Sequence, residues 1–267
     1  MHNISLVLFT IFAQAAVGMV LLLSLMPTVA PQPEGAPLRA VNAHKNFRTG
    51  SAIALVFLAV GVVFSMLHLS DKLISYYSIA NVATSWLSRE IIMVGLFGMA
   101  TLWLVVSGKR VAAFVATLMG LGLVYVMAMI YQTPPIPFWH TNLTMYVFFA
   151  SALVLGAATL LAMQAMRGDL CGILATILMV GGALRACLGV AQLANSFETA
   201  AELPLVYMHL AGITLAMVLV FLANRIRAGQ KSPSTGAGAM LLAAALVWAA
   251  EIAARIMFYA STTSLTM

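Results

Sequence analysis

Long apolar runs separated by short polar connections repeat along the whole chain. Eight of them reach the ~20 residues that a helix needs to cross the hydrocarbon core of a bilayer. Backbone groups in lipid must form their hydrogen bonds internally, and these unbroken runs lack the alternation of barrel strands, so each run predicts a helix. We expect helices near residues 4–26, 49–68, 87–107, 110–131, 142–166, 170–193, 204–225 and 238–260.

The connections between the runs are too short to fold as a soluble domain. Residues 108–109 and 167–169 leave room only for antiparallel hairpins, while three prolines within residues 133–142 break helix geometry. The pattern therefore predicts a single domain over residues 1–267. Its fold class is all-α, a polytopic membrane protein built as a bundle of eight transmembrane helices.

Composition supports this prediction, because 63% of the residues are hydrophobic and only 7% are charged, against about 25% charged in soluble domains. The formal net charge of +6 raises the question of a nucleic-acid partner. The basic residues, however, lie in short loops between apolar runs, where they act as topology signals. We expect membrane lipid and no nucleic acid among the partners.

Basic residues collect in alternate loops, which predicts the orientation of the chain because lysine and arginine favour the cytoplasmic side. One set of loops holds Lys72 and Arg89, whereas the other set holds nine basic residues. We expect the nine on the cytoplasmic side and both termini outside. The nine are Arg39, Lys45, Arg48, Lys109, Arg110, Arg167, Arg225, Arg227 and Lys231.

Histidine and cysteine positions bear on bound cofactors. A transmembrane haem needs two histidines at matching depth on facing helices, and His68 with His209 is the pair that comes nearest to this requirement. Cys171 and Cys187 lie in apolar sequence without CxxC spacing, so they predict no iron–sulfur site. We expect this chain to bind no haem and no metal of its own.

Residues 65–91 carry the candidate chemistry, because they join two apolar runs through a polar linker. His68 ends the first run and Glu90 opens the second, so an imidazole and a carboxylate face each other across one loop. Imidazole titrates near neutrality, and such a pair suits proton transfer at a lipid-accessible site. The alternative is an ordinary interfacial belt of polar and aromatic residues. The aromatic members are Tyr76, Tyr77 and Trp86.

Polar side chains inside apolar runs are costly in lipid and are therefore candidates for function. Glu251 and Arg255 are spaced i, i+4 on one helix face and predict a structural ion pair. Arg185 has no partner on its own helix, which leaves open a contact with Glu251, snorkelling, or an anionic lipid or quinone oxygen. Gln14 predicts an interhelical hydrogen bond or a ligand contact.

Taken together, these features resemble the membrane anchor subunit of the dimethyl sulfoxide reductase family along the whole chain. The chain departs from the family pattern after His68, where HLSDKLISYY lacks the usual glycine, proline and arginine. We therefore expect the loop over the quinol to differ in shape. The segments that carry the resemblance are LFTIFAQ at 8–14, SMLHLS at 65–70, SWLSREI at 85–91, PFWHTNLTMYVFF at 137–149 and AEIAARIMFY at 250–259.

The resemblance implies that the chain oxidises an exchangeable menaquinol, with His68 and Glu90 as the residues that take up its protons. It also implies two partners in the bacterial cytoplasmic (inner) membrane complex, an iron–sulfur subunit with four clusters and a molybdopterin catalytic subunit. The residues expected to contact the quinol or quinone are Ser65, Tyr76, Tyr77, Trp86, Arg89 and Gln14.

A secondary transporter or a channel is the competing hypothesis, since small polytopic proteins with a proline-broken segment can carry substrates. Transporters gather polar residues at the midplane of the membrane. This chain places most of its polar and aromatic residues near one membrane face, which favours the anchor.

Overall fold

A computed structural model describes residues 2–25, 38–68, 81–132, 139–167, 172–194, 203–228 and 236–260. Within these ranges the chain forms eight α-helices and no β-strand. All eight helices are long and apolar enough to cross a membrane. The predicted all-α fold with eight transmembrane helices is therefore confirmed.

The helices follow the predicted runs, with one clear difference at the start of the second. This helix begins at Leu38 rather than near residue 49, because residues 38–46 contain no proline or glycine that would end it. The bounds are α1 His2–Leu25, α2 Leu38–His68, α3 Trp86–Ser107, α4 Arg110–Tyr131, α5 Asn142–Arg167, α6 Gly172–Ala194, α7 Leu203–Ala228 and α8 Ala237–Ala260.

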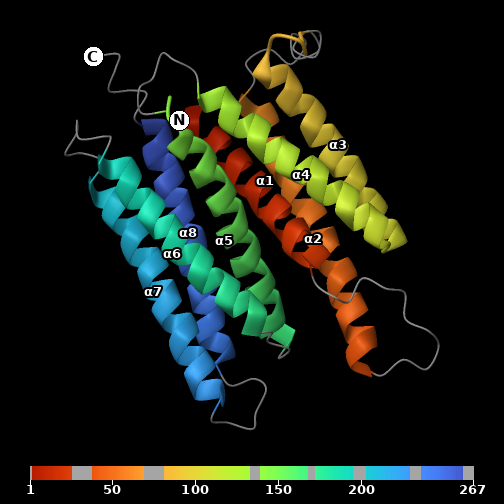
Figure 1. The fold of residues 1–267 in the computed structure, drawn as a ribbon, viewed down its shortest axis with the longest axis vertical. Helices are drawn as coiled ribbons and strands as arrows, with labels where there is room; N and C mark the ends of the chain where they lie inside the picture. The colour runs from red at the N-terminus through yellow and green to blue at the C-terminus, as the bar shows by residue number, and fades with distance from the viewer. Residues whose placement is uncertain are drawn as a thin grey trace.

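The helices form two groups, α1–α4 and α5–α8, which lie side by side in Figure 1. Helices α1 and α5 join the groups: α1 packs against α2, α4, α5 and α8, and α5 packs against α1, α4, α6 and α8. These two helices are also the most buried of the eight. The core of the molecule therefore lies along α1 and α5.

Helices α1 and α5 cross in close backbone contact at two glycines. A Cβ atom on Gly18 would overlap the backbone carbonyl of Ala152, and a Cβ atom on Gly156 would overlap the backbone of Gly18. Small residues let transmembrane helices approach this closely and gain van der Waals contact. The crossing therefore fixes the two groups of helices against each other.

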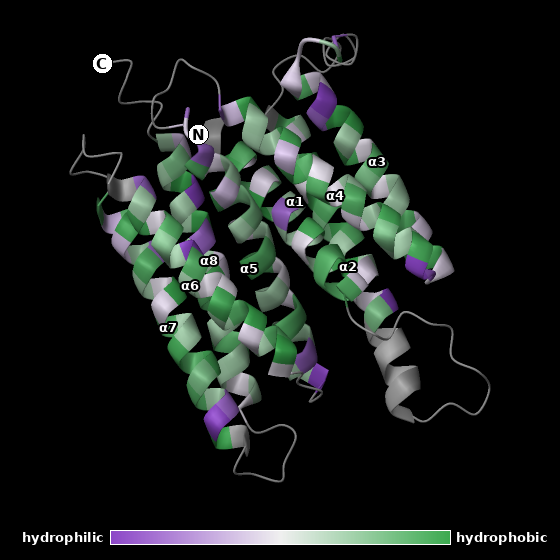
Figure 2. Cartoon of the chain, in the orientation of Figure 1, coloured by the Kyte–Doolittle hydropathy of each residue, from purple (hydrophilic) through white to green (hydrophobic). Residues whose placement is uncertain are grey.

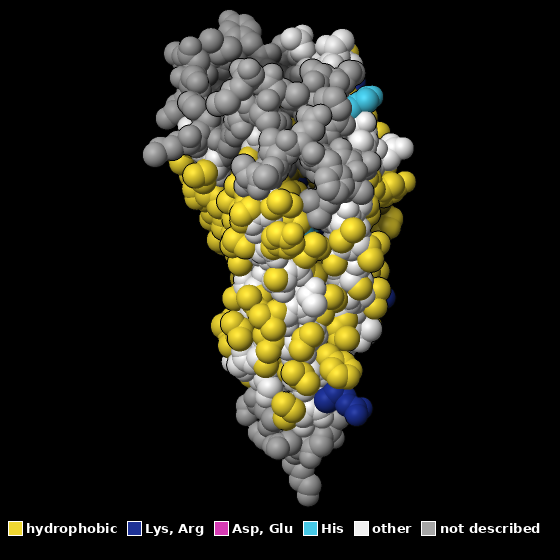
Figure 3. Space-filling view, turned by 90° about the vertical axis from the view of Figure 1, so that its left-hand side faces the viewer, with side chains coloured by type: hydrophobic (Ala, Val, Ile, Leu, Met, Phe, Trp, Pro, Cys, Tyr) yellow, Lys and Arg dark blue, Asp and Glu magenta, His cyan; other side chains and the backbone are white. Residues whose placement is uncertain are grey.

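Hydrophilic residues lie mainly at the helix ends, with a few inside the bundle (Figure 2). Helix α1 begins and α8 ends at the same end of the bundle, which we call the terminal end (Figure 1). A band of apolar side chains covers the face drawn in Figure 3, as expected of a lipid-facing surface. At the opposite end, Gly108 closes the α3–α4 hairpin in a left-handed conformation (φ 62°) and bonds the Leu104 carbonyl.

Candidate functional site

The terminal end of α3 supplies the first part of the candidate site. Ser85 is the N-cap of this helix, and its hydroxyl accepts a hydrogen bond of 3.3 Å from the Ser88 amide. An N-cap serine satisfies an amide that the helix itself cannot pair. The cap explains why α3 begins at Trp86 and fixes which residues of its first turns point inward.

Arg89 folds back over the turn that precedes α3. Its guanidinium donates hydrogen bonds to the carbonyls of Val82 (2.9 Å) and Ala83 (2.6 Å) and lies 4.2 Å from the centre of the Trp86 ring. The structure shows no ion pair between Arg89 and Glu90. Arg89 therefore fixes the shape of the turn and does not pair with the neighbouring carboxylate of Glu90.

Glu90 is directed into the bundle and is only 7% exposed. Its Oε1 atom has no hydrogen-bond partner among the residues that the structure describes. A buried carboxylate without a partner is costly in protein and more so in lipid, which makes Glu90 the strongest functional candidate of the predicted set.

The other predicted residues of this end are placed to different degrees. His68 is the last residue of α2, and Ser65 lies one turn earlier on the same helix, half-buried. Trp86 is half-buried and packs edge-to-face on Tyr125 of α4, with ring centres 6.2 Å apart. Tyr76, Tyr77 and the side chain of His68 lie outside the described part of the chain.

Gln14 is fully buried at the centre of α1 and links α1 to α8. Its Oε1 atom accepts a hydrogen bond of 2.7 Å from Arg255, while its Nε2 atom has no partner within the described ranges. The Arg255 guanidinium also lies 4.0 Å from the centre of the Phe148 ring. Of the two roles considered for Gln14, interhelical hydrogen bonding is the one that this geometry provides.

Five aromatic rings enclose the terminal end of this polar region. Tyr131 contacts each of the other four rings in an edge-to-face or tilted geometry, with distances of 5.1 to 5.7 Å between ring centres. The indole of Trp139 stacks on Phe258 and donates to its carbonyl at 2.9 Å. The hydroxyl of Tyr259 donates to that of Tyr131 at 2.6 Å. The five rings belong to Tyr131, Trp139, Phe148, Phe258 and Tyr259.

A second buried polar cluster lies in the other half of the bundle, with one residue from each of α5, α6, α7 and α8. The Arg185 Nε atom lies 2.9 Å from Glu251 Oε1, and the Ser151 hydroxyl donates to Glu251 Oε2 at 2.6 Å. The ring of His209 contacts the Ala250 carbonyl at 3.1 Å. This cluster ties the four helices together.

The predicted ion pair between Glu251 and Arg255 is wrong. Glu251 pairs with Arg185 of α6, and Arg255 turns to Gln14 of α1. The two residues lie on one helix, but the neighbouring helices supply closer partners for each. The contact between Arg185 and Glu251, one of the alternatives left open, is the one that forms.

Histidines give no paired arrangement in the described helices. His209 points at the α8 backbone within the second half, whereas α2, which ends at His68, packs on α1 and α3. His140 is exposed, and its Nδ1 lies 2.8 Å from the Gln132 carbonyl. Among the residues that the structure describes, no three histidine, cysteine or acidic side chains gather where they could hold a metal ion.

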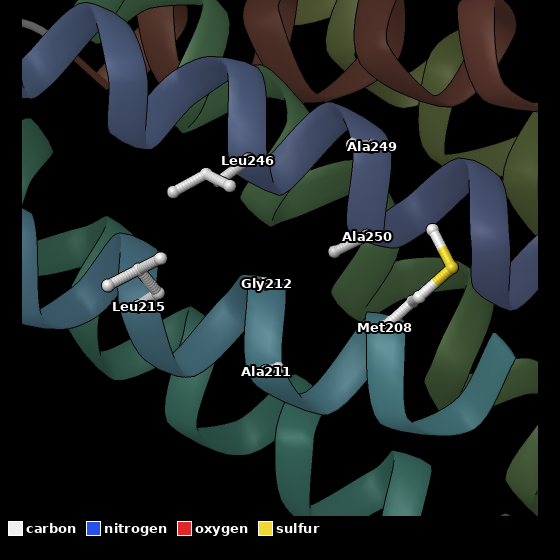
Figure 4. Close-up of a pocket in the computed structure, with 7 residues that line it drawn as sticks. All are labelled: Met208, Ala211, Gly212, Leu215, Leu246, Ala249 and Ala250. Carbon is white, nitrogen blue, oxygen red and sulfur yellow. The ribbon is translucent and has the colours of Figure 1, made fainter. Parts of the chain in front are cut away.

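Two apolar grooves open sideways from the bundle. One, of about 240 Å³, lies between α7 and α8, with Leu246 and Ala250 facing Met208 and Gly212 in Figure 4. The other, of about 700 Å³, is lined by apolar residues of α1 and α6 and, mostly, of α5. Neither groove is lined by a charged side chain. They suit hydrocarbon rather than a polar headgroup.

Comparison with known proteins places the chain in a family. A family model described as "DMSO reductase anchor subunit (DmsC)" matches residues 1–261. The chain belongs to the dimethyl sulfoxide reductase anchor subunit family. It is 26% identical over 275 residues to the YnfH subunit of an anaerobic dimethyl sulfoxide reductase of Escherichia coli, covering 97% of this chain and 94% of that protein. It is also 26% identical over 280 residues to the C subunit of the anaerobic dimethyl sulfoxide reductase of Haemophilus influenzae, with the same coverage.

Family membership confirms the predicted resemblance and the anchor role. The chain is a multi-pass anchor subunit of the bacterial inner membrane, and it belongs to a reductase complex with catalytic and electron-transfer partners. This favours the anchor hypothesis over a transporter or a channel.

Sequence reasoning missed Tyr131, Tyr259 and the Gln14–Arg255 link. Each tyrosine ends an apolar run, a position at which aromatic residues usually form an interfacial belt. One signal was available, because the segment AEIAARIMFY at 250–259 carries both Arg255 and Tyr259. Their i, i+4 spacing places them on one face of α8, but which helices that face meets follows only from the packing of α8 against α1 and α5.

Proposed function

We propose that this anchor subunit oxidises menaquinol at the terminal end of α2 and α3. The quinol loses two protons and two electrons there, and the electrons pass to a cluster of an iron–sulfur subunit. That subunit carries four clusters and in turn serves a molybdopterin catalytic subunit. The anchor contributes no haem and no metal; its ligand is an exchangeable quinone.

The carboxylate of Glu90, which has no ion pair within the described residues, is the observation that carries this proposal. Glu90 is buried, lies within two turns of the start of α3, and has an acceptor oxygen without a partner in the described structure. Buried polar atoms are nearly always hydrogen-bonded. A quinol hydroxyl would supply the missing donor, and the carboxylate would take up its proton as a general base.

His68 is the proposed acceptor of the first quinol proton, and Glu90 is the second acceptor or the group that orients the imidazole. Helix α2 ends at His68 and packs against α3, which carries Glu90, and this placement supports the pairing. Trp86, Ser65, Tyr76 and Tyr77 line the pocket in this proposal. Arg89 holds the turn at the edge of this pocket through its hydrogen bonds to the carbonyls of Val82 and Ala83.

We place this site on the outer side of the membrane, with both termini. The basic residues Arg48, Lys109, Arg110, Arg167 and Arg225 lie at the other end of the bundle, which supports a cytoplasmic location for that end. Electron transfer needs a short separation between donor and acceptor. The iron–sulfur subunit therefore docks on the same outer face, and the catalytic subunit reduces dimethyl sulfoxide or another small S- or N-oxide.

The test separates quinol chemistry from assembly of the complex. His68→Ala and Glu90→Gln are compared with wild type for dimethyl sulfoxide reduction driven by a menaquinol analogue and, separately, by a reduced viologen. We expect the quinol-driven rate to fall by about 10²–10⁴-fold in His68→Ala and somewhat less in Glu90→Gln. The viologen-driven rate and the amount of bound partner subunits should stay near wild type.

Thr101→Val is the matched control for Glu90→Gln. Thr101 is a buried residue of the same helix whose hydroxyl also has no partner in the described ranges, but it lies three turns away from the site. The control should keep both activities. Normal quinol-driven turnover in His68→Ala and Glu90→Gln, with the partners still bound, would show that the proton acceptors lie elsewhere.

A further inference from the structure

Three basic residues lie close together at the end of the bundle opposite the terminal end. Arg48 belongs to α2, Lys109 connects α3 to α4, and Arg110 is the first residue of α4. All three are exposed. We call these three residues the basic corner.

A hydrogen bond holds Arg48 beside the α3–α4 hairpin. Its Nε atom donates to the Val105 carbonyl at 3.2 Å, and Val105 lies one helical turn before Lys109. The bond uses Nε alone. The two terminal nitrogens of the Arg48 guanidinium therefore remain available, within the described ranges, for an acceptor outside the chain.

The backbone on both sides of Lys109 is fixed by hydrogen bonds. The Lys109 amide donates to the Ser107 hydroxyl at 3.3 Å, and its carbonyl accepts from the Ala113 amide at 3.1 Å. Gly108 before it adopts a left-handed conformation and bonds the Leu104 carbonyl. The hairpin thus holds the base of the lysine side chain at a set position next to Arg48, although like charges repel.

Acidic side chains that could offset these charges are scarce at this end. The acidic residues that the structure describes are Glu90, at the terminal end of α3, and Glu251, which pairs with Arg185 in the other half of the bundle. In the sequence, the connections at this end add Glu34 and Asp169, against nine basic residues. An anion from outside the chain would offset the excess positive charge.

Apolar side chains continue from the basic corner along the lipid-facing sides of α3 and α4. Val106, Leu102 and Met99 follow helical spacing on one side of α3, and Val111 and Phe114 do the same on α4. Each of the five is more than half exposed. Figure 2 shows the hydrophilic end of this hairpin beside apolar turns of both helices. Cations next to exposed apolar stripes match the two parts of a phospholipid.

We propose that the basic corner binds the phosphate of an anionic phospholipid, whose acyl chains lie along the apolar sides of α3 and α4. Guanidinium groups bind phosphate oxygens through paired hydrogen bonds, and basic sites between transmembrane helices recognise anionic headgroups. A zwitterionic headgroup fits less well, because its own cation offsets the phosphate charge. This inference is independent of the proposed function, since Glu90 lies at the opposite end of α3.

The test measures which lipid touches the α3–α4 hairpin in the assembled complex. The complex is reconstituted into vesicles of equal parts phosphatidylglycerol and phosphatidylcholine, and one of the two lipids at a time carries a photoactivatable acyl chain. Mass spectrometry of the digested subunit gives the cross-link yield at the hairpin for each lipid. We expect phosphatidylglycerol to be favoured several-fold, and we expect high salt to reduce this preference.

Single substitutions at the basic corner locate the preference. In Arg48→Gln and in Lys109→Gln the preference at the hairpin should fall roughly fivefold, the contribution of one basic residue near an anionic headgroup. Arg48→Lys keeps the charge and should keep most of the preference. Arg225→Gln removes an exposed charge of α7 at the same end of the bundle. This matched control should leave the preference at the hairpin unchanged.

Three results would overturn the inference: equal yields of the two lipids in wild type, an unchanged preference in Arg48→Gln and Lys109→Gln, or an equal fall in Arg225→Gln. The last result would assign the preference to the overall charge of this end. The amount of bound partner subunits shows whether each variant assembles. If the glutamine variants fail to assemble, Arg48→Lys and the salt dependence of wild type decide, and a preference that salt does not reduce would overturn the inference.

Discussion

Glu90 and Glu251 are both buried carboxylates on membrane-spanning helices, yet their surroundings are opposite. Glu251 in the α5–α8 half pairs with Arg185 at 2.9 Å and accepts from Ser151 at 2.6 Å. Glu90 in the α1–α4 half has no ion pair among the described residues, and this is what distinguishes it from Glu251. Charges in a membrane protein are costly unless they are paired. Glu251 thus has a structural explanation, whereas Glu90 needs a functional one.

The largest effect on stability is expected at the paired carboxylate. Glu251→Ala leaves the Arg185 guanidinium buried without a counter-charge, which should destabilise the subunit by about 3–5 kcal/mol. Thermal denaturation of the detergent-solubilised complex and the amount of subunit in the membrane measure this effect. A double variant, Arg185→Met with Glu251→Leu, should recover most of the lost stability, because it removes both charges. If the Glu251→Ala protein is as stable as wild type, Glu251 has no larger structural role than Glu90.

An intermediate effect is expected at Ser151, which bridges the same ion pair. Ser151→Ala removes the hydroxyl that donates to Glu251 and accepts from Arg185 at 3.2 Å. Hydrogen bonds to charged groups contribute about 1.5–3 kcal/mol, so the thermal midpoint should fall by less than in Glu251→Ala. Ser107→Ala, at a helix end where the hydroxyl bonds only backbone, is the control. Equal midpoints for Ser151→Ala and this control would mean that the bridge adds nothing.

The smallest effect on stability is expected at Glu90. Glu90→Gln keeps the shape of a buried side chain that has no ion pair within the described residues, so the free energy of unfolding should change by no more than about 0.5 kcal/mol or should rise. The same thermal measurement checks this value against Glu251→Ala. A loss of stability as large as that of Glu251→Ala would reveal a structural partner for Glu90 and remove the main support for its role in quinol oxidation.

The fold was predictable from the sequence because the bilayer imposes a length and a composition on each helix. This length and composition located the apolar run that ends at His68 and the run that follows it near residue 87. The family resemblance then marked the motifs around His68 and Glu90 as the candidate site. The pairing of Arg185 with Glu251 was one of several alternatives left open, and the sequence could not choose among them. It depends on how each helix is rotated about its axis, and helices that are apolar on nearly every side do not reveal this rotation.

The same reason hid the contact between Tyr131 and Tyr259. Tyr131 and Tyr259 lie at the ends of apolar runs, more than a hundred residues apart in sequence, and nothing local distinguishes them from interfacial aromatics. They meet only because α1 and α5 hold α4 and α8 at fixed positions. The local signals identified Glu90 as a candidate, but the aromatic cluster around Tyr131 is a product of tertiary packing.

The backbone contact between Gly18 and Gly156 has a consequence for the order of assembly in the cell. Helix α1 has its tightest backbone contact with α5, and the ribosome makes three other helices, α2, α3 and α4, between the two. Until then Gly18 lacks the α5 backbone that packs against it in the finished bundle. The insertion of α5 is therefore the step that commits the nascent chain to its final packing, and a chain released after Tyr131 would keep an open seam for lipid or for another nascent helix.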